Sequence, residues 1–112
     1  MRDLNRMRRF EYRLPRTTTD FSVDFVVGEE TFCGLCRDIG DAGIRAEFDD
    51  PLAVGSFGLL ILRHPTRLLK VEAQVTYFER YQAGLSFLAQ KPRERAMITE
   101  FIALITNHSS TS

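Results

Sequence analysis

Long apolar runs are missing from this chain of 112 residues. A transmembrane helix needs roughly 18 or more consecutive apolar residues, and no segment reaches that length. A secretory signal needs a continuous apolar stretch near its start, whereas the first twenty residues here alternate arginine with single apolar residues. We therefore expect a cytoplasmic protein without a membrane span. The length favours a single domain with one hydrophobic core.

Metal-binding side chains are also scarce. The chain has two cysteines, Cys33 and Cys36, and two histidines, His64 and His108. Zinc usually takes four ligands from such residues, and two residues three apart in a strand point to opposite faces. The CxxC pair therefore predicts neither a metal site nor a redox site. We expect one buried and one ordinary cysteine, both reduced.

No set of residues suggests catalysis. Ser56 and Ser86 lack a histidine partner that would activate them as nucleophiles. Glu47, Asp49 and Asp50 cluster in the sequence, but the ligand spacing of a cation-binding loop does not follow them. We read this acidic cluster as a solvated turn. The sequence predicts a protein that is not an enzyme and that has no cofactor.

Lysine is rare, and the charges are unevenly distributed. Residues 1–16 hold six arginines and two acidic residues, a charge of +4, while the rest has nine basic and thirteen acidic residues, a charge of −4. We expect 1–16 to form a basic arm, and its guanidinium groups suit phosphates and purine edges. RNA or DNA binding through this arm is the weakest of three functional hypotheses. The arm's arginines are Arg2, Arg6, Arg8, Arg9, Arg13 and Arg16.

Alternation of apolar and polar residues predicts six strands, because successive side chains of a half-buried strand face opposite sides. In the fifth strand, Leu69, Val71, Ala73, Val75 and Tyr77 are expected to face inward. Turn-forming residues, several of them glycine, separate the strands. The expected strands are 19–27, 31–39, 44–48, 57–63, 68–78 and 82–89.

The period changes after Pro92, a residue that suits a helix N-terminus. A helix over about 93–105 would place five apolar side chains on one face. We expect residues 107–112 to be a disordered tail, so that 17–106 form the folded domain. The fold class is mostly β: a six-stranded antiparallel β-barrel with a C-terminal α-helix covering one opening. The apolar residues of the helix are Met97, Ile98, Phe101, Ile102 and Ile105.

Two short motifs resemble those of a known family. The segment 9–13 reads RxxxR just before the first expected strand, and the segment 38–43, which starts 25 residues later, reads DxGxxG. The pair is similar to the RxxxR and [D/N]xSxxG motifs of PilZ domains, which are bacterial receptors for the second messenger cyclic di-GMP. Segments 75–77 and 84–87 and the terminal helix also resemble that family. The resemblance covers roughly residues 8–105.

The resemblance implies a split-barrel fold and a ligand-binding site. Arg9 and Arg13 would hold guanines and phosphates, because arginine can bond both O6 and N7 of guanine. Asp38 would accept hydrogen bonds from guanine N–H groups, and the two motif glycines would allow close backbone approach and positive φ. At least one of the two arginines that flank the second motif is expected to face the ligand. The candidate residues are Arg8, Arg9, Arg13, Asp38, Gly40 and Gly43, with Arg37 and Arg45 in addition.

One departure from the family pattern leaves an alternative open. Gly40 stands where the motif has serine, which removes a hydroxyl expected to bond the ligand. The first hypothesis is a cyclic di-GMP receptor whose surface changes on binding and then acts on a partner protein. The alternative is a PilZ-like adaptor that binds a protein without nucleotide.

Overall fold

The computed structural model describes residues 17–110, with side chains as far as Thr106. The expected arm, with Arg8, Arg9 and Arg13, lies outside the described residues, and so does the end of the expected tail. Within the described range no helix is long and apolar enough to cross a membrane. The elements are β2 (Thr17–Thr18), β3 (Ser22–Val27), β4 (Glu30–Gly40), β5 (Gly43–Phe48), β6 (Phe57–His64), β7 (Arg67–Glu79), β8 (Gln82–Phe87) and α1 (Pro92–Ser110).

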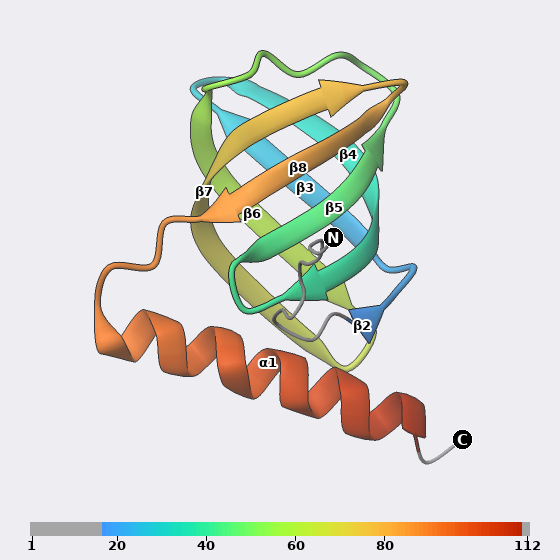
Figure 1. The fold of residues 1–112 in the computed structure, drawn as a ribbon, viewed down its shortest axis with the longest axis vertical. Coiled ribbons are helices and arrows are strands. Elements are labelled where there is room, and N and C mark those ends of the chain that lie inside the picture. Colours follow the sequence, from blue (N-terminus) through green and yellow to red (C-terminus); the bar gives the residue numbers. More distant parts are fainter. Residues whose placement is uncertain (1–16, 111–112) are drawn as a thin grey trace, which may run out of the picture.

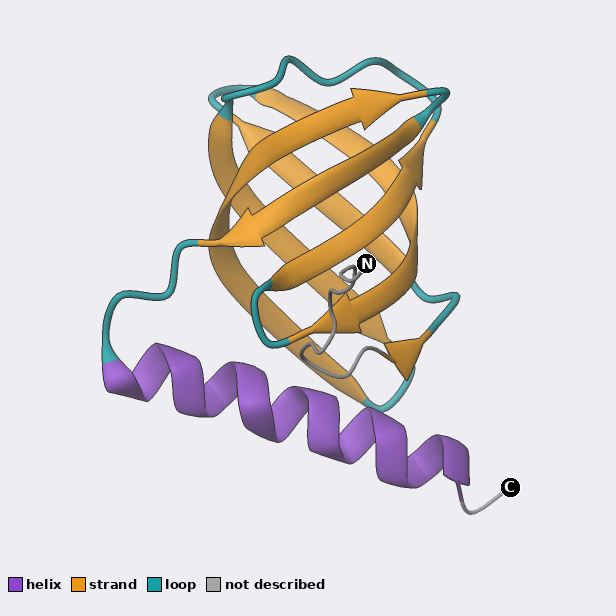
Figure 2. Cartoon of the chain, viewed as in Figure 1, coloured by secondary structure: helices purple, strands orange, loops and turns teal. Residues whose placement is uncertain are grey.

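The strands close into a barrel, as the sequence predicts. Six of them pair in the order β4-β3-β6-β7-β8-β5, and β5 pairs back with β4. Every pairing is antiparallel, and the short β2 adds to β4. Figure 1 shows the strands wrapping around a common axis, and Figure 2 shows helix α1 beneath them. Closure leaves the six strands without the free edges of an open sheet.

Alternate residues fill the barrel, and most of the inward positions are the expected ones. Phe25, Leu60 and Val75 are almost fully buried. Tyr77 is the exception, because 43% of it is exposed. The register shifts between Val75 and Tyr77, and a bulge reverses which face each later residue takes. Phe78 packs against the core in its place.

The first expected strand, 19–27, is interrupted at 19–21. There the chain faces a bulge on β4, where the register shifts between Cys36 and Asp38. Thr19 bridges the irregular stretch: its N–H donates to the carbonyl of Arg37 at 2.8 Å, and its hydroxyl donates to the carbonyl of Cys36 at 3.0 Å. β2 then pairs with β4 beyond the bulge.

The helix α1 lies across the lower end of the barrel in Figure 1. Ile98, Phe101 and Ile105 are buried, as expected, whereas Met97 is 46% exposed, contrary to expectation. The Phe101 ring meets Phe21 edge-on, with 5.8 Å between centroids. The helix continues to Ser110, into the segment expected to be a tail, because residues 106–110 include no glycine or proline to end it.

The packing of α1 can be tested with two isomeric neighbours. Ile105 is 1% exposed and Leu104 is 38% exposed. We expect Ile105→Ala to lower the free energy of unfolding by about 2–5 kcal/mol, because it leaves a cavity against the barrel. The control Leu104→Ala should change it by about 0.5 kcal/mol or less. Urea denaturation measures both, and equal losses would contradict this docking of the helix.

Candidate functional site

An open pocket of about 570 Å³ lies on the outer face of the barrel, over β4, β5, β7 and β8. Side chains and backbone from two strand pairs meet there. The β4–β5 hairpin supplies Asp38, Gly43 and Arg45, and the β7–β8 hairpin supplies Tyr77 and Gly84. Three of the residues predicted for a ligand site therefore border one cavity.

The bulge on β4 turns Asp38 toward this surface. Cys36 and Ile39 are both fully buried although they are three residues apart, which regular alternation would not allow. The extra residue is Arg37, because Cys36 pairs with Ala46 and Asp38 pairs with Arg45. In a regular strand Asp38, two residues beyond Cys36, would share the core-facing side with it.

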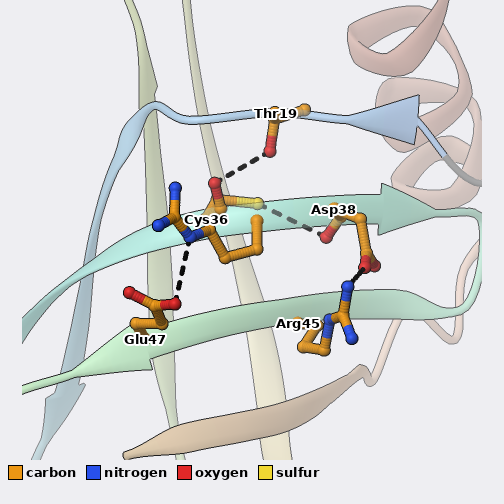
Figure 3. A network of polar contacts seen from close by, with 6 residues as sticks. Thr19, Cys36, Asp38, Arg45 and Glu47 are labelled. Carbon is orange, nitrogen blue, oxygen red and sulfur yellow. Dashed lines mark hydrogen bonds and ion pairs between the residues drawn. The ribbon is translucent and has the colours of Figure 1, made fainter.

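Two ion pairs flank the bulge, and Figure 3 shows them side by side. Arg45 Nη2 lies 2.7 Å from Asp38 Oδ2, and the Asp38 side chain is only 12% exposed. Arg37 Nε lies 3.2 Å from Glu47 Oε2, and both of those side chains are partly exposed. Of the two flanking arginines, Arg45 borders the pocket. Arg37 does not line the pocket and instead pairs with Glu47.

Gly43 is required by the close approach of β5 to β8. A Cβ at this position would collide with the carbonyl oxygen of Leu85. The expectation of positive φ at the motif glycines is wrong, because the described glycines with positive φ are Gly28 and Gly55. Gly40 instead ends β4, paired with Gly43 across the turn.

Sequence reasoning missed Tyr77, which it assigned to the core. The bulge in β7 turns the Tyr77 ring outward over Gly84, where a Cβ would collide with that ring. The Thr76 hydroxyl donates to the carbonyl of Gly84 at 3.0 Å. The aromatic residue and the glycine are a recognisable pair, but only once the register between the two strands is known.

The two cysteines lie on opposite faces, as the strand geometry predicts. Cys33 is exposed and Cys36 is buried, and both are free thiols. A hydrogen bond with Asp24 and the charge of that carboxylate raise the pKa of the Cys33 thiol, which disfavours its reactive thiolate form. Among the side chains of residues 17–106, no cluster of three or more His, Cys, Asp or Glu could hold a metal ion.

This geometry can be compared with known proteins. The sequence model of the PilZ domain matches residues 7–104, which is most of the chain. The chain belongs to the PilZ domain family. No curated protein matches it.

Solved structures share the fold of this PilZ domain at low sequence identity. The PilZ domain of YcgR from Escherichia coli with c-di-GMP is 12% identical, with a TM-score of 0.76 over 89% of this chain and 95% of that one. The Bacillus subtilis inhibitor of motility MotI/DgrA is 23% identical, with a TM-score of 0.67 over 96% of this chain and 57% of that one. The K. pneumonia MrkH–c-di-GMP complex is 17% identical, with a TM-score of 0.68 over 92% of this chain and 56% of that one. The PilZ domain thus spans little more than half of the two longer proteins.

The contact of Tyr77 with Gly84 can be tested by a double-mutant cycle. We expect Gly84→Ala to lower the free energy of unfolding by about 1–3 kcal/mol, because the added methyl group displaces the ring. In a Tyr77→Ala background the same change should cost much less. Urea denaturation of the wild type, the two single variants and the double variant gives the coupling free energy between Tyr77 and Gly84. An equal cost in both backgrounds would show that the ring does not cover Gly84.

Proposed function

We propose that this PilZ domain is a cytoplasmic, non-enzymatic receptor for cyclic di-GMP, which binds at the outer pocket. The observation that carries the proposal is the convergence of Asp38, Gly43 and Arg45 on one open cavity. The YcgR domain and MrkH, which share the fold, have structures with c-di-GMP. Both observations support the same ligand for this chain.

The chemistry of the pocket suits a guanine nucleotide. Asp38 can accept hydrogen bonds from guanine N–H groups, and Arg45 supplies a cation for a phosphate oxygen. Their mutual ion pair at 2.7 Å must be shared with the ligand or rearranged by it. Arg9 and Arg13 are proposed to bind guanines and phosphates, with Arg8 in support.

The proposed output is a change of surface. Residues 1–16 precede β2 directly, and β2 pairs with β4 beside Asp38. A ligand that draws the arginines of this segment toward the pocket would therefore alter the surface around β2. An effector protein that recognises the altered surface would complete the signal.

The adaptor alternative is favoured by two features of the same site. Gly40 supplies no hydroxyl where the family motif has serine. The Asp38 carboxylate already has a charged partner in Arg45. A domain that keeps these interactions permanently would bind its effector without nucleotide.

Calorimetric titration with cyclic di-GMP tests the receptor proposal. Arg9→Ala and Arg13→Ala should each weaken binding by roughly 5- to 150-fold, because a bidentate arginine–guanine contact is worth about 1–3 kcal/mol. Asp38→Ala should also weaken it. The control Arg2→Ala removes the same charge outside the motif and should have little effect. Equal losses at all six arginines of the segment, with a steep salt dependence, would favour RNA or DNA instead.

Gly40→Ser separates the receptor from the adaptor. Gly40 lies at the end of a strand without positive φ, so serine fits its backbone conformation. Restoring the hydroxyl should leave the affinity for cyclic di-GMP unchanged or raise it. If neither the wild type nor this variant binds at high micromolar ligand, the receptor proposal is wrong. A pull-down for protein partners would then test the adaptor.

A further inference from the structure

A second pocket, of about 610 Å³, adjoins the first at the far end of the β7–β8 hairpin. Tyr77 borders both cavities. The other lining residues are Glu79, Arg80 and Gln82. Glu79 lies two residues beyond Tyr77 on β7 and therefore shares its outward face, and Gln82 pairs with Glu79 across the hairpin.

The turn that carries Arg80 is conformationally strained. Arg80 has φ of 54° and Tyr81 has φ of 67°, and these two residues connect the paired Glu79 and Gln82. Such a two-residue turn strongly favours asparagine and glycine, because other residues pay a steric cost at positive φ. Backbone strain of this kind gathers at functional sites. Of the two strained residues, Arg80 is the one that lines the second pocket.

We propose that the second pocket binds one guanine base of the cyclic dinucleotide whose other half occupies the first pocket. This inference rests on the proposed receptor function. The Arg80 guanidinium can bond O6 and N7 of guanine together, and the Tyr77 ring offers a face on which a base can stack. Glu79 can accept hydrogen bonds from guanine N1–H and the exocyclic amine, and the Gln82 amide can donate or accept at the base edge.

The same set of groups discriminates against adenine. Adenine has an amine in place of O6 and an unprotonated N1, so it would offer Arg80 only N7 and Glu79 only the exocyclic amine, one hydrogen bond each in place of two. The loss of one hydrogen bond at each of these two charged groups lowers the affinity for adenine relative to guanine. The two guanines of a cyclic dinucleotide project from opposite sides of its sugar–phosphate ring. One guanine can therefore occupy the first pocket and the other the second pocket, with Tyr77 between them.

Arg80→Gly tests the inference, because glycine removes the guanidinium while it suits the turn. By calorimetry this variant should bind cyclic di-GMP roughly 5- to 150-fold more weakly than the wild type. Its melting temperature should be unchanged or higher, since glycine relieves the strain at positive φ. The matched control Tyr81→Gly changes the neighbouring residue of the same turn, which does not line the pocket, and should keep wild-type affinity.

A second variant tests the reading of the base. The wild type should bind cyclic di-GMP more tightly than cyclic di-AMP. Glu79→Gln should narrow that preference, because it lowers the affinity for cyclic di-GMP. If Arg80→Gly binds cyclic di-GMP as the wild type does, while Arg9→Ala and Arg13→Ala lose binding, the second pocket is not a subsite and the receptor proposal stands. An unchanged preference in Glu79→Gln would also overturn the subsite. If the wild type does not bind, both proposals fail together.

Discussion

The extra residue in β4 at Arg37 is the constraint on which the candidate site depends. A regular strand would place Cys36 and Asp38 on the same face, and a carboxylate inside this apolar barrel would be costly to bury. The bulge keeps Cys36 and Ile39 in the core and turns Asp38 outward, where Arg45 meets it. One inserted residue thus satisfies the core and creates the charged edge of the pocket.

A second bulge, at Thr76 in β7, reverses the faces of the residues that line the other side of the first pocket. It sends Phe78 to the core and leaves Tyr77 on the outer surface, over Gly84. Asp38, Arg45, Gly84 and Tyr77 pair in one continuous row across β4, β5, β8 and β7, so a bulge adjoins each end of that row. Bulges commonly re-aim side chains beside binding sites. The first pocket lies between the β4 bulge and the β7 bulge.

The short β2 connects this surface to the helix. Thr18 pairs with Asp38 on β4, and the Thr17 hydroxyl lies 3.1 Å from that of Thr106 on α1. The segment that precedes β2 carries the RxxxR motif. β2 therefore links the strand that carries Asp38 to Thr106 of α1.

The sequence by itself determined the strands, the terminal helix and most of the core, because the alternation of side chains in a strand and the helical period are local properties. The family motifs likewise pointed to Asp38 and Gly43 without any structure. Tertiary structure alone decided that Tyr77 faces outward, that Arg45 pairs with Asp38, and that Arg80 borders a cavity. Each of these depends on the register between strands distant in sequence, and a single bulge shifts that register and reverses every face beyond it.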